Sequence, residues 1–163
     1  MPRASPAVID AAPALSALAI VVGAAAALVQ ALGLARWTYA VPELARRYLA
    51  AADGPGGEGT REIIRVVFAV QHRLLGVGVG EHLGYMLTGM WTLIVAMSIL
   101  STAVVPAWLG FIGLPIGAAL LVGALEFVGP AEREGWWLAG AIVPIAYIAW
   151  SLWLAAFGVL LIA

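Results

Sequence analysis

Gly80-Glu81-His82-Leu83-Gly84-Tyr85 places a carboxylate and an imidazole inside a stretch that otherwise has the composition of a lipid-facing helix. An ionisable side chain in hydrocarbon costs roughly 2.5–3.5 kcal/mol on insertion scales, so such residues usually face a protein interior. The stretch therefore predicts a membrane protein with a polar site inside its helical bundle. It does not identify what that site binds.

The composition of the whole chain supports the same class of protein. Hydrophobic residues make up 64% of the 163 residues and charged residues 10%, and the mean hydropathy is +1.04. A soluble domain carries about 25% charged residues, whereas a bilayer accommodates this apolar excess. The net charge of −1 gives no reason to expect nucleic acid as a partner, and the absence of cysteine excludes disulfides and Cys-based metal sites.

Charge-free runs divide the chain into four expected membrane spans, each long enough to cross a hydrocarbon layer of about 30 Å. The runs cover residues 11–35, 76–100, 107–128 and 136–162. We therefore predict an all-α fold, an integral membrane four-helix bundle, formed by a single transmembrane domain over residues 1–163. A cleaved signal peptide is the alternative interpretation of the first run.

The connection over residues 36–60 is expected to contain an additional short interfacial helix. Pro42 suits its first turn, and Asp53-Gly54-Pro55 ends it. Apolar side chains fall on one of its faces and charged side chains on the other, which is typical of a helix lying on the cytoplasmic membrane surface. A helix packed on other protein is the alternative. We expect Gly54–Gly59 to be a hinge and the next helix to start at Thr60.

The placement of arginine predicts the orientation of the chain in the membrane. All eight basic residues are arginine, and the chain between the first two spans carries most of them, while the connection Ser101–Pro106 carries none. Those between the spans are Arg36, Arg46, Arg47, Arg61 and Arg65, with Arg73 just inside the next helix. Positively charged connections stay in the cytoplasm, so we expect both termini outside. The absence of lysine and the abundance of Ala and Gly are typical of a GC-rich bacterial genome, and we expect the inner (plasma) membrane as the location.

Small residues recur every four positions along the second span and form one stripe, which lets membrane helices approach closely. The stripe comprises Gly76, Gly80, Gly84, Thr88 and Thr92. A polar edge that includes Glu81 and Tyr85 runs beside it. Three interpretations stay open at this point: packing of the bundle, a pocket against the glycine stripe, and a contact between copies of the chain.

Helix lengths place polar residues from three spans at a similar depth, near the cytoplasmic boundary of the membrane. The expected polar layer consists of Gln30, Arg73, Glu81, His82, Tyr85 and Glu126. Two carboxylates in one apolar layer either share a proton or pair with a cation, and Arg73 and His82 are the available partners. The alternatives are an interhelical hydrogen bond for Gln30 and an interfacial side chain reaching water for Glu126.

Metal and cofactor chemistry finds little support in the sequence. The only histidines, His72 and His82, lie about 15 Å apart along one helix, so they cannot ligate opposite faces of one haem. Common catalytic and nucleotide-binding motifs are absent, and the glycine run Gly76–Gly80 sits inside an apolar helix with no strand before it. We expect no metal and no cofactor, although a mixed Glu/His site with Glu126 stays open.

Several short blocks of this sequence occur together in one family of membrane proteins. They are Leu34–Trp37, Val41-Pro42, Leu44–Arg46, Gln71-His72, Gly76, Gly80–Gly84 with its G-E-H-L-G signature, and Pro106–Gly110. Through them the chain resembles a bacterial, actinobacterial-type family of polytopic membrane proteins of unknown function, from Ala19 onward. The resemblance implies that this chain corresponds to the C-terminal four-helix part of family members, and it implies no activity.

Three classes of function stay open from the sequence. A structural or accessory membrane subunit is favoured, with the glycine stripe packing on a partner subunit or a second copy within the lipid bilayer. The alternative is the binding or transport of a small polar ligand, a cation or a proton through the Glu/His layer. An intramembrane enzyme using Glu81 or His82 as acid or base is the least favoured class.

Single cysteines test the orientation, because the natural chain has none. Gly59→Cys, in the arginine-rich connection, should resist a membrane-impermeant maleimide in intact cells and react fully after lysis. Ser101→Cys, in the connection without arginine, is the matched control and should react in intact cells. Labelling of Gly59→Cys from outside would reverse the orientation.

Overall fold

The computed structural model describes residues 6–51, 56–102 and 104–162, and every element in these ranges is helical. In chain order the elements are α1 (Pro6–Thr38), α2 (Ala40–Ala50), α3 (Gly57–Gln71), the π-helix η2 (His72–Leu83), α4 (Gly84–Thr102), α5 (Ala107–Gly123), the short 3₁₀ helix η3 (Gly129–Ala131) and α6 (Trp137–Ile162). This arrangement confirms the all-α membrane bundle.

Three continuous helical stretches are long and apolar enough to cross a membrane. They are Pro13–Ala50, Gly57–Thr102 and Trp137–Ile162. The fourth apolar helix, α5, has 17 residues, which is the lower limit for crossing the hydrocarbon layer. It ends at Gly123, before the end of the expected span at residue 128, because the chain turns there toward η3.

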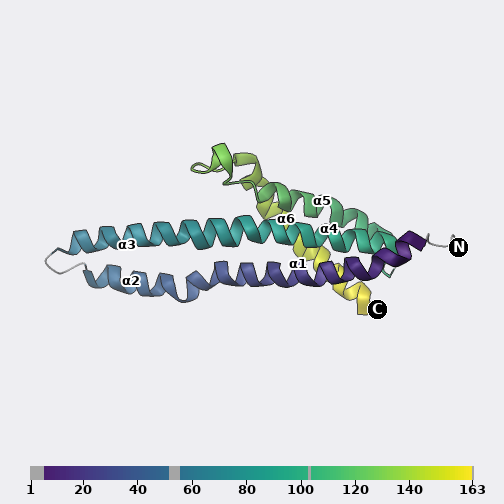
Figure 1. Ribbon diagram of the computed structural model, residues 1–163. Coiled ribbons are helices and arrows are strands. Elements are labelled where there is room, and N and C mark those ends of the chain that lie inside the picture. Colours follow the sequence, from purple (N-terminus) through teal and green to yellow (C-terminus); the bar gives the residue numbers. More distant parts are fainter. Residues whose placement is uncertain (1–5, 52–55, 103, 163) are drawn as a thin grey trace.

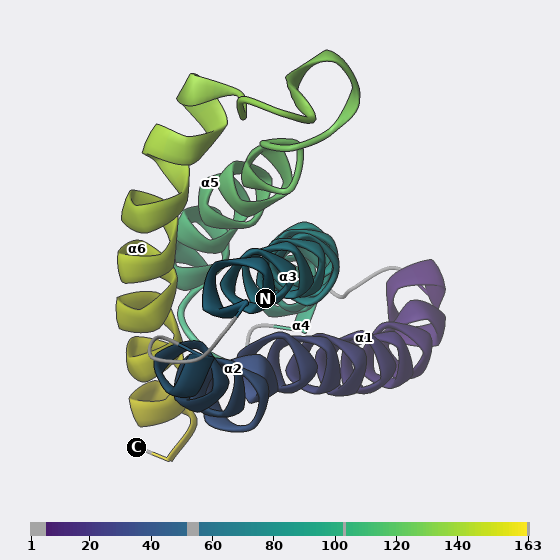
Figure 2. The ribbon, with the colours of Figure 1, turned by 90° about the vertical axis from the view of Figure 1, so that its left-hand side faces the viewer.

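The central helix of the bundle is α4. Both α1 and α5 pack on it, and α6 packs on α5 (Figure 2). The start of α1, the connection between α4 and α5, and the end of α6 lie at one end, here called the terminal end (Figure 1). The opposite end, called the hairpin end, carries α2, α3 and the connection over residues 124–136.

Aromatic side chains join α4 to α6 in the apolar core. The ring of Trp91 meets Trp150 and Trp153 edge to face, with centroid distances of 6.4 and 6.2 Å. The indole Nε1 of Trp153 donates to the carbonyl of Leu109 on α5 at 2.9 Å, so this buried ring has its polar group satisfied. Large rings therefore span the distance between these helices.

The expected short helix between the first two spans is present as α2. It runs in nearly the same direction as α1, whereas a helix lying flat on a membrane surface would run across the direction of the spans. It continues α1 after a turn at Tyr39 and runs beside α3, so the two form a hairpin that extends past α5 and α6 (Figure 1). At 1.5 Å per residue, the stretch Pro13–Ala50 is about 57 Å long, nearly twice the hydrocarbon thickness. The stretch Pro13–Ala50 is therefore too long to lie across the hydrocarbon layer alone, and one of its ends must extend beyond that layer.

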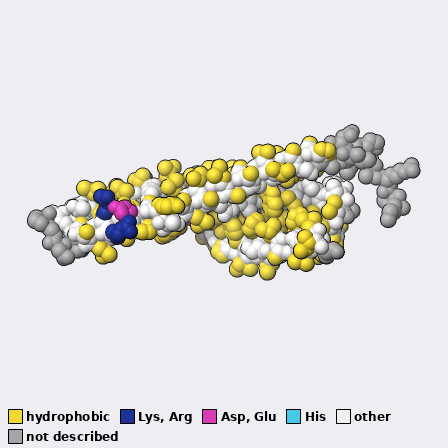
Figure 3. All heavy atoms as spheres, turned by 90° about the horizontal axis from the view of Figure 1, so that it is seen from below, with side chains coloured by type: hydrophobic (Ala, Val, Ile, Leu, Met, Phe, Trp, Pro, Cys, Tyr) yellow, Lys and Arg dark blue, Asp and Glu magenta, His cyan; other side chains and the backbone are white. Residues whose placement is uncertain are grey.

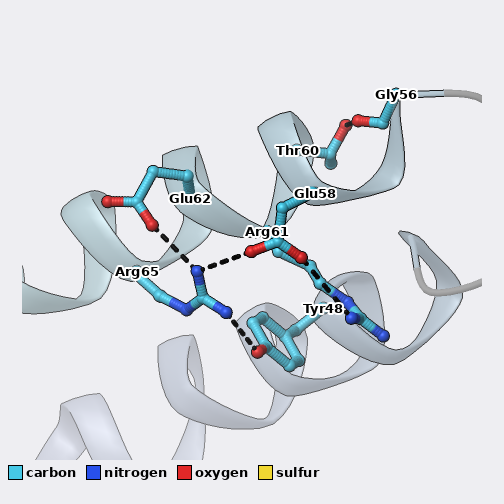
Figure 4. Close-up of polar contacts among 7 residues, drawn as sticks. All are labelled: Tyr48, Gly56, Glu58, Thr60, Arg61, Glu62 and Arg65. Atoms are coloured by element: carbon cyan, nitrogen blue, oxygen red, sulfur yellow. Dashed lines mark hydrogen bonds and ion pairs between the residues drawn. The ribbon is translucent and has the colours of Figure 1, made fainter.

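Contacts with α3 explain this direction of α2. Arg65 Nη1 lies 3.0 Å from Glu58 and 2.8 Å from Glu62, while its Nη2 donates to the hydroxyl of Tyr48 on α2 at 2.9 Å (Figure 4). The guanidinium of Arg61 lies over the same tyrosine ring, 5.2 Å from its centroid. Each exposed ion pair is worth little, but together they fix Tyr48 between two arginines of α3.

The start of α3 differs from the expected hinge. Gly56 has a φ of 79°, a left-handed conformation that favours glycine, and the helix begins directly after it at Gly57. The amide of Thr60 donates to the carbonyl of Gly56, so the predicted helix start at Thr60 is three residues late. The predicted terminator of α2, Asp53-Gly54-Pro55, lies outside the described residues.

The middle of the second long stretch is a π-helix, which the sequence pattern did not predict. At its end the amide of Gly84 reaches the carbonyl of Val79, five residues earlier instead of four. A helix wound in this way is rare and is found often at functional sites. The run Gly76–Gly80, with glycine at alternate positions, gives the backbone the freedom to widen there.

Glycines bring α1 and η2 into backbone contact. A Cβ at Gly33 would lie 2.6 Å from the Cα of Gly80, which is closer than real atoms approach. One turn further along, a Cβ at Gly84 would lie 3.3 Å from Cγ of Gln30. Gly78 points elsewhere, and a Cβ there would meet only the carbonyl of Arg73 in its own helix, at 3.6 Å.

Matched leucine substitutions test this contact. Gly80→Leu should lower the free energy of unfolding by about 3 kcal/mol, because the side chain would push η2 away from α1. Gly78→Leu adds the same volume on an open face of the same helix and should cost less than 1 kcal/mol. Unfolding in mixed micelles, followed by tryptophan fluorescence, measures both. Equal losses would show that the glycine stripe does not carry the contact.

Candidate functional site

A cavity of about 250 Å³ lies between α1, η2, α4 and α6, toward the hairpin end of the bundle. Its lining residues are Gln30, Gly33, Leu34, Arg36, Gly76, Gly80, Glu81, Tyr85 and Tyr147. We call it the Arg36–Glu81 cavity, after its two charged side chains. Three members of the predicted polar layer line it, namely Gln30, Glu81 and Tyr85.

Arg36 enters the cavity from the last turn of α1. Its Nη1 donates to the carbonyl of Gly33 at 3.0 Å, and its guanidinium lies over the ring of Trp37, 5.1 Å from the centroid. Gly76 provides the space, since a Cβ there would lie 2.7 Å from Cζ of Arg36. The buried Nε atom makes no hydrogen bond. Nη2 of Arg36 donates to no described residue, so Arg36 keeps a donor group for a ligand that enters the cavity.

Glu81 stands on the η2 wall of the same cavity. Within the described part of the chain, no donor lies within hydrogen-bond distance of its carboxylate and no cation lies within ion-pair distance. Its charge interacts with the charge of Glu126, which adds repulsion instead of compensation. The cavity thus holds an arginine and a glutamate that face the same space without pairing with each other.

A hydrogen-bond network holds the wall of the cavity toward the membrane interior. Gln30 Nε2 donates to Thr88 Oγ1 at 2.8 Å and to the hydroxyl of Tyr147 at 3.3 Å. The rings of Tyr147 and Tyr85 meet edge to face, with centroids 5.3 Å apart. These contacts link α1, α4 and α6, so Gln30 makes the interhelical bond that was one of its two expected roles.

The remaining members of the predicted layer lie toward the connection over residues 124–136. His82 Nδ1 donates to the carbonyl of Ala124 at 2.6 Å. Arg73 pairs with Glu132 at 3.5 Å, donates to the same residue's carbonyl, and lies over the ring of Phe127. Arg73, one of the partners expected for Glu81, therefore pairs with Glu132 instead, and His82 of the same chain is engaged with this connection as well.

Glu126 lies in the turn that follows α5 and is not among the residues that line the cavity. Its Oε1 lies against Gly140 of α6, where a Cβ would come within 2.8 Å, and its backbone carbonyl accepts from the amide of Trp136 at 2.7 Å. Among the described residues, no group of three or more His, Cys, Asp or Glu side chains could hold a metal ion. The chemistry of the cavity therefore depends on Arg36, Glu81 and their uncharged neighbours.

Arg36 and Tyr147 are the site residues that the sequence analysis missed. Arg36 ends the first apolar run, where an arginine is the ordinary flank of a membrane span. Tyr147 lies inside the last apolar run, where a tyrosine is usually a packing residue. The signal lay in the pairing of two helices: Gly33 on α1 faces Gly80 on η2, and one turn away Gly76 on η2 leaves room for the guanidinium of Arg36.

Comparison with known proteins gives one match. A family model described as a domain of unknown function, DUF4386, matches residues 6–158. No curated protein and no solved structure matches the chain. The matched range includes every residue of the Arg36–Glu81 cavity.

A double-mutant cycle measures the Gln30–Thr88 bond. Gln30→Leu and Thr88→Val remove its donor and its acceptor, and we expect a coupling free energy of about 0.6–1.5 kcal/mol, the range for hydrogen bonds between membrane helices. The free energy of unfolding in mixed micelles is the readout. Strictly additive effects would mean that this bond does not hold the cavity wall.

Proposed function

From the premise that this chain belongs to the DUF4386 family, whose function is unknown, we propose that it is a membrane protein that binds a small charged ligand in the Arg36–Glu81 cavity. The ligand carries an anionic group that pairs with Arg36 and a cationic or hydrogen-bond-donating group that pairs with Glu81. Gln30 and the two tyrosines, Tyr85 and Tyr147, supply neutral hydrogen-bonding and aromatic surface around it.

The observation that supports this function is the pair of opposite charges that face one space without touching. A charge removed from water is costly unless it is paired and hydrogen-bonded. Arg36 makes one hydrogen bond, to the carbonyl of Gly33, and Glu81 makes none with the described residues, so neither charge has a charged partner in the cavity. A ligand with complementary charges would compensate both at once, which favours binding over a purely structural role for this end of the bundle.

The depth of the cavity indicates from which side a ligand enters. Glu81 lies about 30 Å along the helix axis from Thr102, the end of α4, at 1.5 Å per residue. This distance equals the thickness of the hydrocarbon layer, so the cavity would lie at the headgroup level of the hairpin side. With the arginine distribution, we propose that this is the cytoplasmic side of a bacterial inner membrane and that both termini are outside.

A second candidate function, as an accessory subunit, is favoured by the hairpin. Neither α2 nor α3 has a buried residue, and large apolar side chains such as Leu49 and Ile63 are 71% and 66% exposed. A helical pair of this composition outside the membrane offers a surface to a partner subunit or to a second copy. The two functions are compatible, because the hairpin and the cavity use different residues.

Titration calorimetry with phosphoethanolamine, a soluble zwitterion, tests the ligand-binding function. The purified protein should bind it, Arg36→Gln should abolish the binding, and Glu81→Gln should weaken it about tenfold, because each variant removes one charge of the pair. Ethanolamine and inorganic phosphate, which each carry one of the two charges, should bind more weakly than the zwitterion.

Arg133→Gln is the matched control, because it removes an exposed arginine from the connection over residues 124–136. It should bind phosphoethanolamine as the natural protein does. Equal binding by the natural protein and by Arg36→Gln, or no binding by either, would contradict the proposed site.

A further inference from the structure

A second hollow continues from the cavity into the membrane. It is an apolar groove of about 430 Å³ between α1 and α6, and its residues include Gly23, Ala24, Ala27, Trp91, Trp150 and Leu154. We call it the α1/α6 groove. The groove exists because α1 packs on α4 whereas α6 packs on α5, so α1 and α6 do not close on each other. Trp91 of α4 and Trp150 of α6 line the space that remains.

The groove and the cavity meet at Gln30, which lines both. From there the groove follows α1 back to Ala19, a distance of about 16 Å along the axis. The surface on this side of the molecule is hydrophobic over the bundle, and its charged side chains gather at the hairpin end (Figure 3). The two hollows therefore adjoin at Gln30 and its bonds to Thr88 and Tyr147, with Arg36 and Glu81 on one side and an apolar lining on the other.

Small residues keep the α1 side of the groove open. Ala24 and Ala27 are exposed and present only methyl groups to it. A Cβ at Gly23 would lie 2.7 Å from Nε1 of Trp91, so glycine at this position lets the indole approach α1 closely. The groove is thus lined by small side chains on α1 and by the indoles of Trp91 and Trp150, which leaves room for a flexible hydrocarbon chain.

We propose that the α1/α6 groove and the Arg36–Glu81 cavity together hold one aminophospholipid. Its phosphate pairs with Arg36, its ammonium group pairs with Glu81, and one acyl chain lies along Trp91 and Trp150. The second chain remains in the bilayer. This assignment rests on the proposed function and names the class of its ligand.

Charge complementarity favours a lipid over a transmembrane helix in the groove. A helix seated between α1 and α6 would fill the apolar part and leave Arg36 and Glu81 uncompensated at its end. A lipid with an anionic group alone would satisfy Arg36 and bring a negative charge toward Glu81. A zwitterionic headgroup with a primary ammonium satisfies both, because the ammonium offers three donors to the carboxylate.

Native mass spectrometry of the detergent-purified protein tests the assignment, with phosphatidylethanolamine and phosphatidylglycerol as equimolar probes. The natural protein should retain phosphatidylethanolamine in preference to phosphatidylglycerol. Ala27→Phe fills the groove and should reduce the retention of phosphatidylethanolamine about tenfold. Ala155→Phe adds the same side chain at an exposed position of α6 outside the groove and should retain lipid as the natural protein does. Glu81→Gln should remove the preference between the two lipids.

A soluble headgroup separates failure of this assignment from failure of the proposed function. sn-Glycero-3-phosphoethanolamine lacks the chains, so it should bind Ala27→Phe and the natural protein equally, and Arg36→Gln should bind neither the headgroup nor the lipid. Unchanged lipid retention by Ala27→Phe, with headgroup binding still dependent on Arg36, would overturn the acyl-chain site alone. Loss of a dimer or of a co-purifying subunit in Ala27→Phe, at unchanged lipid retention, would assign the groove to a helix. Headgroup binding independent of Arg36 would overturn both proposals.

Discussion

The backbone contact between Gly33 and Gly80 is the constraint on which the candidate site depends. On the α1 side only glycine permits this separation, since a Cβ at Gly33 would lie 2.6 Å from the Cα of Gly80, while a Cβ at Gly80 would be in tight contact with α1 at 3.4 Å. One turn toward the hairpin, the same separation places the guanidinium of Arg36 on Gly76, and one turn the other way it places Gln30 on Gly84. Both polar side chains thus reach the interior because their partners on η2 have no side chain. Small residues in membrane helices are usually discussed as packing devices, and here they also create the room for charged and amide groups.

Hydropathy and periodicity were enough to predict the class of fold and part of the site. A long charge-free run predicts a segment inside the bilayer, where no water is present. Such a segment forms a helix, because a helix satisfies the polar groups of its backbone internally. The cost of burying Glu81 and Gln30 indicated that both face the protein, and both line the cavity. The π-helix was beyond such an analysis, since an apolar glycine run suits an α-helix and a π-helix alike. Arg36 was missed for a related reason, because its position in the sequence is that of an ordinary flanking charge and its role depends on the glycine opposite.

Partners of charged residues were the least predictable feature. Depth along the helices suggested that Arg73 could reach Glu81, yet its partner is Glu132, in a connection whose path depends on the turns at the end of α5. The direction of α2 was difficult for the same reason. The apolar face of α2 predicted contact either with the membrane surface or with other protein. The ring of Tyr48 lies against two arginines of α3, so α2 packs on this neighbouring helix. Both features depend on side-chain pairs between different helices and connections, and the sequence pattern within one element does not predict such pairs.

The hairpin connects the cavity to a distant surface of the protein. Arg36 belongs to α1, which α2 follows, and Glu81 belongs to η2, which follows α3, so the two charged walls of the cavity are continuous with the two helices of the hairpin (Figure 1). The third wall, with Tyr147, stands on α6 and has no such extension. A partner bound to the hairpin would therefore be connected to the cavity through the two helices that carry Arg36 and Glu81. The π-helical turns of η2 carry Gly76, Gly80 and Glu81, so the wider helix is itself a wall of the cavity.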